Sequence, residues 1–478
     1  MGKFSRSTLG LLLILVLGFV VRLYKIDNPV ADWHSWRQAD TAAVTRNFVW
    51  EGINLFYPKF DDLSSIPSGK PNPKGYRFVE FPIYNAISAF GAKILAKFLT
   101  VEICSRLVSI FFSLASCYLL FLITKNFFGE KVGLLSAFFF AILPYNIYYS
   151  RVILPEPMMV MCSLGMIYFF YRWMENNKLL SCYLVILFAA VGLLLKPIVA
   201  FLFLPLFYLI WRERKLKGFF PFFLFVFLSF VPLLIWRWWV SHFPEGIPAY
   251  LWLLNQDKIR FKGAWFWWLF GKRIGELILG FWGLVPFGLG LVLKPGKKEG
   301  WFFHFWLLAI LLYFSVFATG NVRHDYYQII SIPIICVFLG KGMNFLLSVP
   351  RRSFNSVLCY LFSVICILFM LAFSWYKVRT YYWINRPEIV EAGKAVDRLV
   401  PKDAKVIAPY KGDTAFLYQT KRKGWPIVEA PLEEMRKWGA EYLVSVDVKD
   451  KGIQGLKKKY KVLEETDSYI IFDLRKTL

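Results

Sequence analysis

Long apolar segments alternate with short polar connectors over most of the chain. The segments are about 17–23 residues long, which is the length at which an α-helix crosses the hydrocarbon core of a bilayer. The pattern predicts about eleven membrane-spanning helices. We place them at residues 8–24, 104–123, 132–149, 157–173, 180–196, 198–211, 218–239, 274–293, 301–319, 328–347 and 354–375.

The pattern changes after residue 375. Apolar residues then recur at every second position in "AKVIAPY" (404–410), "AEYLVSV" (440–446) and "SYIIFDL" (468–474), which is typical of β-strands. Segments such as "LEEMRKWG" (432–439) are typical of helices. We therefore expect an all-α polytopic membrane domain at 1–375, followed by a small α/β domain at 376–478.

The composition agrees with a membrane protein and excludes an ordinary soluble one. The 478 residues are 57% hydrophobic and 19% aromatic, with a mean hydropathy of +0.48. The formal net charge of +25 comes largely from Lys and Arg in connectors between apolar segments, rather than from one nucleic-acid-binding surface. These basic connectors are residues 124–131, 211–217, 293–299 and 348–353.

Basic connectors mark the cytoplasmic side of a membrane protein. The N-terminus is then cytoplasmic, and the C-terminal domain and the long loop at 25–103 are extracytoplasmic, in a protein of the plasma (inner) membrane. The loop contains an apolar segment at 81–99 that carries Lys93 and Lys97. We expect it to form a helix at the outer interface rather than a span.

With this topology, the unusual polar residues gather on the outer side. They lie in residues 29–48, 76–85, 143–159 and 320–333, and at the end of the span before Pro197. Charged side chains near membrane depth are costly, so such a group indicates function. The candidates are Asp32, His34, Arg37, Asp40, Glu80, Arg151, Glu156, Lys196, Arg323, His324 and Tyr326.

Each candidate also has a structural interpretation. Asp32 is suited to cap a helix that begins at Trp33, and Arg37 is placed to pair with Asp40 one helical turn later. Glu156 is suited to cap the span that follows it. The convergence of all these residues on one side of the membrane favours function for the group.

A lipid-linked sugar phosphate would use these side chains. Arg, Lys or His would hold the leaving phosphate, and a carboxylate would take the proton of the acceptor hydroxyl. Tyr and Trp suit sugar rings and the interface alike. Two other functions stay open: a flippase for lipid-linked saccharides, which would favour a polar path through the spans, and a non-catalytic scaffold.

Four segments carry a resemblance to a known family: "TRNF" (45–48), "FVEFPIYN" (78–85), "YYSRVILPEP" (148–157) and "RHDYYQIISIP" (323–333). In order and spacing they resemble the C-type membrane glycosyltransferases of the protein O-mannosyltransferase and lipid A aminoarabinose transferase group. The resemblance covers about residues 8–350 and implies the C-type glycosyltransferase fold. It also implies transfer of a sugar from a polyprenyl-phosphate donor, with inversion, to a glycan, lipid or protein acceptor.

The resemblance also implies residue roles. A first-loop Asp would be the general base, Glu80 would line the acceptor or metal side, and Glu156 would be the second acidic group. Three further residues would lie near the donor phosphate: Arg323, His324 and Tyr326.

The chain departs from the family pattern at two positions. Counting back from "RN" places Arg37 where an Asp is usual, so the base is either Asp32 or Asp40, and the position directly after the first span favours Asp32. Phe81 stands where the family has a Lys, so phosphate contact must come from Arg37, Lys196 or Arg323. The acidic and His residues show no metal-ligand spacing, so we expect no obligatory cofactor and leave a divalent metal ion open.

Overall fold

The computed structural model describes residues 6–213, 216–348 and 355–478. The chain forms two compact units. The helical unit consists of Met1–Tyr24, Leu107–Arg237 and Tyr250–Thr380. The mixed unit consists of Lys25–Arg106, Trp238–Ala249 and Tyr381–Leu478.

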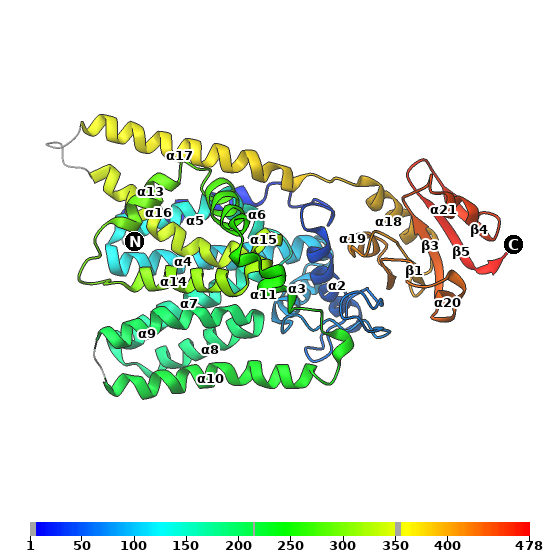
Figure 1. Ribbon diagram of the computed structural model, residues 1–478, viewed down its shortest axis with the longest axis horizontal. Coiled ribbons are helices and arrows are strands. Elements are labelled where there is room, and N and C mark those ends of the chain that lie inside the picture. The colour runs from blue at the N-terminus through cyan, green and yellow to red at the C-terminus, as the bar shows by residue number, and fades with distance from the viewer. Residues whose placement is uncertain (1–5, 214–215, 349–354) are drawn as a thin grey trace. The chain divides into compact units, whose positions relative to one another are not determined.

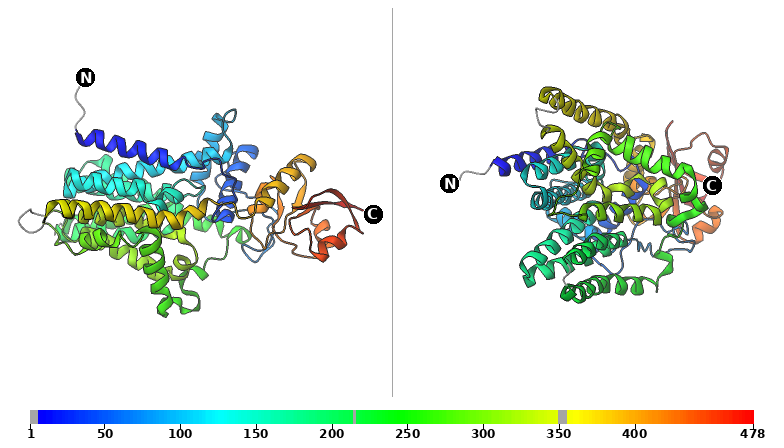
Figure 2. Two further views of the ribbon diagram at one scale, coloured as in Figure 1. Left: turned by 90° about the horizontal axis from the view of Figure 1, so that it is seen from above. Right: turned by 60° about the vertical axis from the view of Figure 1, so that its left-hand side comes forward.

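The helical unit is built from packed helices, and α7 and α8 run side by side (Figure 1 and the right-hand view of Figure 2). α16 packs against both α5 and α13. The α-helices, of which α4 and α10 extend into the mixed unit, are α1 (Arg6–Arg22), α4 (Val101–Phe128), α5 (Glu130–Ile142), α6 (Pro144–Tyr149), α7 (Glu156–Asn176), α8 (Leu179–Leu195), α9 (Phe203–Arg212), α10 (Leu216–Val240), α11 (Trp252–Asn255), α12 (Gly263–Phe266), α13 (Leu284–Val292), α14 (Phe302–Val316), α15 (Ala318–Arg323), α16 (Ile332–Ser348) and α17 (Ser356–Val378). The 3₁₀ and π segments are η1 (Pro197–Leu202), η3 (Gln256–Phe261), η4 (Trp267–Ile278), η5 (Asp325–Ser331) and η6 (Arg379–Tyr382).

Two of the predicted spans are interrupted. The span at 132–149 divides at Leu143, because the proline that follows begins a new helix, α6. The span at 274–293 divides between η4 and α13, where Gly280 and Phe281 have positive φ angles of 49° and 57°. A backbone with positive φ angles cannot continue a right-handed helix.

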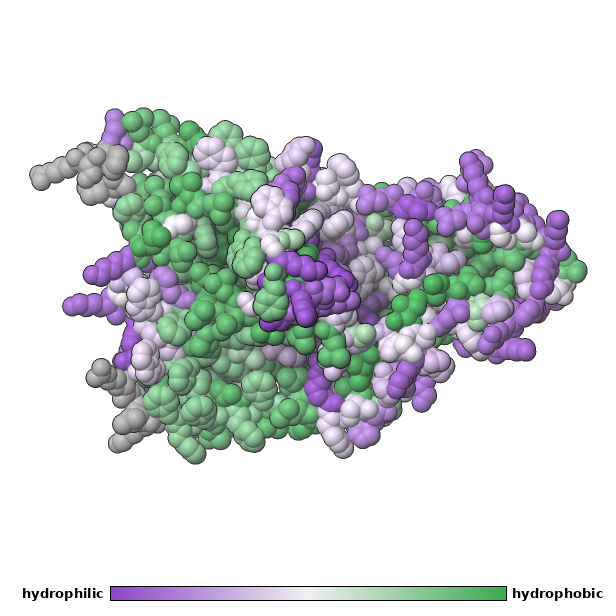
Figure 3. All heavy atoms as spheres, in the orientation of Figure 1, coloured by the Kyte–Doolittle hydropathy of each residue, from purple (hydrophilic) through white to green (hydrophobic). Residues whose placement is uncertain are grey.

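The exposed side chains of the helical unit are those expected in contact with lipid. Phe111, Phe223 and Leu358 are 65%, 59% and 64% exposed on long apolar helices. Figure 3 shows apolar side chains gathered over α10 and α17, whereas the C-terminal strands and helices carry many hydrophilic ones. Within the described residues, four segments are long and apolar enough to cross a membrane: Val101–Phe128, Phe219–Val240, Asp325–Ser348 and Val357–Leu399. The protein is thus a multi-pass membrane protein, while the total of eleven spans stays a prediction.

The mixed unit contains the predicted C-terminal α/β domain. Its five strands have the order β2-β1-β3-β5-β4, with β1 parallel to β2 and β3, and β5 antiparallel to β3 and β4. Buried Ile407, Leu443 and Phe472 lie in its core. The strands are β1 (Lys405–Ile407), β2 (Gly424–Trp425), β3 (Ala440–Ser445), β4 (Tyr460–Glu465) and β5 (Ile470–Thr477). The helices of the unit are α2 (Ser35–Glu51), α3 (Ile83–Ile94), η2 (Pro244–Gly246), α18 (Pro387–Leu399), α19 (Ala415–Gln419), α20 (Leu432–Lys437) and α21 (Lys451–Leu456).

The loop at 25–103 and the C-terminal domain pack together in this unit. The Leu63 amide donates to the Gly424 carbonyl at 2.8 Å, and the Gly424 amide donates to the Asp61 carbonyl at 2.9 Å. A residue of the first loop therefore extends the hydrogen bonding of β2, which the sequence prediction did not include. The apolar segment expected to be helical at 81–99 forms α3, and its position at the membrane interface stays a prediction.

Candidate functional site

In the mixed unit, the candidate residues lie on α2 and in the turn before it, except Glu80, which lies just before α3. The helix begins at Ser35 with His34 as N-cap, and the left-handed backbone of His34 (φ 52°) starts the helix without a side-chain cap. The alternative interpretation of Asp32 as the cap of a helix beginning at Trp33 is therefore wrong. Asp32 instead accepts a hydrogen bond at Oδ1 from the side-chain amide of Gln38, at 2.6 Å. A residue of the first turn thus fixes the orientation of this buried carboxylate.

The two charged residues of the first α2 turns do not pair with each other. Arg37 forms an ion pair with Glu80, and Asp40 forms one with Arg77, whose Nη2 lies 2.5 Å from Oδ2. The segment 77–80 brings one cation and one anion against the helix, so each α2 charge pairs with that segment. The expected pair between Arg37 and Asp40 is wrong, but the structure does bring together two predicted site residues, Arg37 and Glu80.

Both oxygens of Asp40 are engaged. Oδ2 faces Arg77, and Oδ1 accepts a hydrogen bond at 2.7 Å from the hydroxyl of Thr414 in the C-terminal domain. Asp40 is 4% exposed. Its carboxylate therefore links the segment 77–80 to the C-terminal domain, which is a structural role.

Two further carboxylates near Asp40 were not predicted. Burial, with a smaller contribution from the charge of Asp40, raises the pKa of Asp62 to about 7 against the opposing effect of a hydrogen bond from the Ser64 amide. Burial likewise raises the pKa of Asp413 to about 6, again with a contribution from Asp40. These residues stand far apart in sequence, so no local pattern indicates that they share one electrostatic environment.

The second half of α2 is tied to the C-terminal domain by Arg46. The guanidinium is buried, forms an ion pair with Asp61 and donates to the Tyr418 carbonyl at 3.0 Å. Its carbon atom Cζ lies 4.2 Å from the centre of the Tyr418 ring, and the Tyr418 hydroxyl donates to Glu102 at 2.5 Å. The Arg of the "TRNF" segment therefore stabilises the unit through a buried network.

In the helical unit, the central feature is a buried ion pair between Glu156 and Lys196. The ammonium nitrogen of Lys196, directly after α8, lies 3.2 Å from Oε1 of Glu156, the first residue of α7. Glu156 makes no capping hydrogen bond, so its interpretation as a helix cap is wrong. In the described parts of the chain, no hydrogen bond to either of its buried carboxylate oxygens is present. The side chain of Lys196 also lies over the ring of Tyr327, 5.8 Å from its centre.

A second buried carboxylate of the helical unit, Asp325, was not assigned a role from the sequence. Its Oδ1 accepts a hydrogen bond from Tyr149, and its backbone carbonyl accepts one from Tyr145 at 2.5 Å. Its Oδ2 lies 3.5 Å from Nη1 of Arg273. This network ties α6 and η4 to the start of η5, next to the predicted residues at 323–326.

The remaining predicted residues of the helical unit make aromatic contacts. Arg323 is exposed and lies 5.6 Å from the ring centre of Trp252. The ring of His324 stacks on Tyr326 at 5.5 Å and meets Trp252 edge-on at 5.5 Å. Arg151 is fully buried, 5.6 Å from the ring centre of Tyr148.

A divalent metal ion, left open by the sequence, finds no ready set of ligands. Among the residues that the structure describes, no three His, Cys, Asp or Glu side chains form a group suited to a metal ion. The predicted acidic residues are instead paired with Arg, Lys or amide groups. No step proposed below passes through a metal.

Comparison with known proteins defines the class of the fold. The family described as Dolichyl-phosphate-mannose-protein mannosyltransferase matches residues 80–236. ArnT from Cupriavidus metallidurans, solved with undecaprenyl phosphate, superposes with a TM-score of 0.70 at 12% identity, covering 96% of this chain and 97% of that one. The chain has the fold of the C-type membrane glycosyltransferases, which confirms the family resemblance and the fold class predicted from the sequence.

A second solved structure supports the same fold. The Archaeoglobus fulgidus oligosaccharyltransferase, in complex with Zn and sulfate, has a TM-score of 0.57 at 11% identity, covering 96% of this chain and 73% of that one. No curated protein matches the sequence. The similarity to solved structures is therefore one of fold.

Proposed function

We propose that the protein is a membrane glycosyltransferase that transfers a sugar, with inversion, from a polyprenyl-phosphate donor to an acceptor hydroxyl at the extracytoplasmic face. The fold supports the class of reaction, and the ArnT structure of the same fold contains undecaprenyl phosphate. The observation that carries the proposal is the buried ion pair between Glu156 and Lys196.

A buried ion pair is a poor way to stabilise a protein. Removing two charges from water costs more than their attraction returns unless further hydrogen bonds complete the site. The carboxylate of Glu156 is 3% exposed and accepts no hydrogen bond from the described residues. Its oxygens are suited to sugar hydroxyl groups, and the ammonium of Lys196 is suited to the donor phosphate, whose negative charge grows as it leaves.

We assign the general base to Asp32 rather than Asp40. Arg77 and Thr414 hold the carboxylate of Asp40 in a structural contact, whereas Asp32, oriented by Gln38, is the first candidate carboxylate after the first predicted span. In the proposed reaction Asp32 takes the proton of the acceptor hydroxyl, and the acceptor oxygen forms a bond to the anomeric carbon. The bond from that carbon to the phosphate oxygen breaks, and polyprenyl phosphate leaves with the electron pair.

The aromatic and basic residues at 323–326 are assigned to the donor. Arg323 and His324 would contact its phosphate, and the stacked ring of Tyr326 would lie against its sugar or prenyl group. Glu80, whose charge is balanced by Arg37, is assigned to the acceptor. Arg151 is assigned a supporting position near the donor.

The test is a transfer assay with purified full-length protein in detergent. A panel of polyprenyl-phosphate sugars is incubated with cell-envelope acceptors, and mass spectrometry measures consumed donor and released polyprenyl phosphate. The Asp32→Asn variant should lose about 10²–10⁴-fold in transfer rate, the usual contribution of a general base. Lys196→Met should weaken transfer, and Lys196→Arg should retain part of it.

Asp40→Asn is the matched control, because it changes the same side chain eight residues later in the sequence. It should lower stability more than it lowers the turnover of the folded fraction. Full transfer by both Asp32→Asn and Glu156→Gln would overturn the proposal. Movement of donor across a vesicle membrane without release of polyprenyl phosphate would favour a flippase instead.

A further inference from the structure

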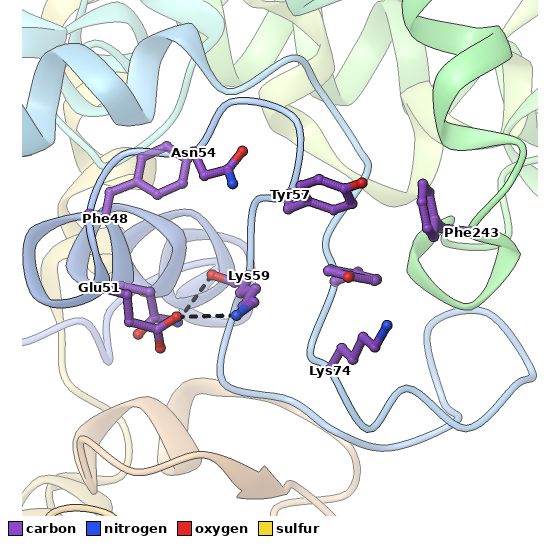
Figure 4. Close-up of a pocket in the computed structure, with 10 residues that line it drawn as sticks. Phe48, Glu51, Asn54, Tyr57, Lys59, Lys74 and Phe243 are labelled. Carbon is purple, nitrogen blue, oxygen red and sulfur yellow. Dashed lines mark hydrogen bonds and ion pairs between the residues drawn. The ribbon is translucent and has the colours of Figure 1, made fainter.

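The mixed unit contains a second candidate site, at the far end of α2. A cavity of about 360 Å³ lies where the helix ends at Glu51, and Figure 4 shows Phe48 and Glu51 on one side of it and Phe243 on the other. This volume falls within the range of about 300–1,000 Å³ that is usual for small-molecule sites. Neither sequence nor fold comparison assigned a role to it.

One wall of the cavity is aromatic and rigid. Tyr57, Tyr76 and Phe243 lie with their ring centres 5.6–5.7 Å apart. Gly246 packs so closely behind them that a Cβ atom there would lie 2.8 Å from Cβ of Tyr76 and 2.4 Å from the ring of Phe78. Such a fixed aromatic surface suits the C–H face of a sugar ring, because little side-chain freedom is lost on binding.

A buried amide side chain also borders the cavity. Asn47, 2% exposed, donates its side-chain amide to the Lys59 carbonyl at 3.0 Å. Within the described ranges, its Oδ1 accepts no hydrogen bond. This oxygen is shielded from solvent, so the amide holds the Lys59 backbone in place beside the cavity rather than contacting a ligand.

The charge of the lining favours an anion. Glu51 is balanced by Lys59, whose Nζ lies 3.4 Å away (Figure 4), and it also pairs with Lys423. Lys74 is exposed at the edge of the cavity, 5.6 Å from the ring centre of Tyr76. No ion pair joins Lys74 to a carboxylate in the part of the chain that the structure describes. The cavity therefore offers an ammonium group beside an aromatic wall.

We propose that this cavity binds a negatively charged sugar unit, a uronic acid or a sugar phosphate, within the acceptor. The assignment to the acceptor rests on the proposed function. Glu51 follows Arg37 by 14 residues, which is about 21 Å along the helix axis. The unit bound here is then not the one whose hydroxyl reacts at Asp32, so the acceptor is an oligosaccharide or a longer glycan rather than a single sugar.

The test measures binding alone, with full-length protein in detergent micelles and isothermal titration calorimetry. The probes are a glucuronate-containing tetrasaccharide, its carboxyl-reduced neutral counterpart, and the same neutral tetrasaccharide carrying one phosphate. Whichever of the two acidic probes binds more tightly should have a dissociation constant about tenfold lower than that of the neutral probe, as one charge-assisted hydrogen bond predicts. Comparison of the two acidic probes identifies the anion.

The variants separate this site from catalysis. Lys74→Gln should remove the preference for the acidic probe, Lys74→Arg should retain it, and Tyr57→Ala should weaken all three probes. Asp32→Asn should bind them as the unchanged protein does, so failure of transfer leaves this result intact. Absence of saturable acidic binding, or an unchanged acidic preference in Lys74→Gln, would overturn the proposal.

Discussion

The buried carboxyl group of Asp62 makes the stability of the protein dependent on pH. The side chain is 1% exposed, and burial raises its pKa from 3.8 to about 7. Asp62→Asn removes the charge but retains an oxygen that can accept the hydrogen bond from the Ser64 amide, which is 2.8 Å long. We expect this variant to be more stable than the unchanged protein at alkaline pH.

The magnitude follows from the pKa shift of Asp62. Between about pH 4 and pH 7 the unfolded chain releases a proton that the folded protein retains, so stability falls as pH rises through this window. Above pH 7 the folded protein carries the full cost of a buried charge. With about 1.4 kcal/mol for each pKa unit, the cost approaches about 4 kcal/mol. Asp62→Asn should therefore gain up to about 4 kcal/mol at pH 8 and little at pH 4.

Thermal unfolding of the detergent-solubilised protein, followed by intrinsic fluorescence at pH 4, 5, 6, 7 and 8, measures this gain. Asp467→Asn, at an exposed carboxylate of the same unit, is the matched control and should show no pH-dependent gain. An equal melting temperature for Asp62→Asn and the unchanged protein at pH 8 would refute the reasoning. A gain that is largest at pH 4 would refute its sign.

Three substitutions test other parts of the structure by thermal unfolding. Asp40→Asn leaves Arg77 buried without its counter-ion and should lower the free energy of unfolding by about 3–5 kcal/mol. Limited proteolysis should then cut the C-terminal segment faster than in the unchanged protein. Unchanged cleavage would contradict the structural role of Asp40. Gly246→Ala should lower the free energy of unfolding by about 1–3 kcal/mol, because its Cβ would lie 2.4 Å from the ring of Phe78. It should also weaken sugar binding. An unchanged melting temperature would contradict the close packing behind the aromatic wall. Tyr149→Phe removes a donor to buried Asp325 and should cost about 1–3 kcal/mol, an expectation that an unshifted melting temperature would exclude.

The fold was predictable to the extent that local periodicity determines it. Apolar segments long enough to span a bilayer became helices. The segments of period two at 404–410 and 440–446 contain β1 and β3, and the segment at 468–474 contains the first five residues of β5. The pairing of β2 with residues 61–63 was not predictable, because it depends on backbone contacts across more than 300 residues. The breaks at Leu143 and Gly280 lie in apolar segments, where hydropathy alone does not reveal them.

The candidate site was predictable as a set of side chains but not as a set of contacts. Charged residues near apolar segments identified Glu156 and Lys196 separately, and the structure joins them. The partner of Asp40 was predicted as Arg37, because helical spacing considers only neighbours on the same helix. Arg77 approaches from a segment with no regular pattern, so nothing in the local sequence favoured it.

The burial of α2 also bears on how the chain is assembled during synthesis. The mixed unit takes its first segment from Lys25–Arg106 and its last from Tyr381–Leu478, so about 270 residues are made between them. Thr414 and Tyr418 follow Arg106 by about 310 residues, so at about 5–20 residues per second the first segment waits roughly 15–60 s for them. Throughout that interval Asp40 and Arg46 lack part of their final partners. We therefore expect the loop at 25–103 to be more susceptible to proteolysis during synthesis than in the finished protein.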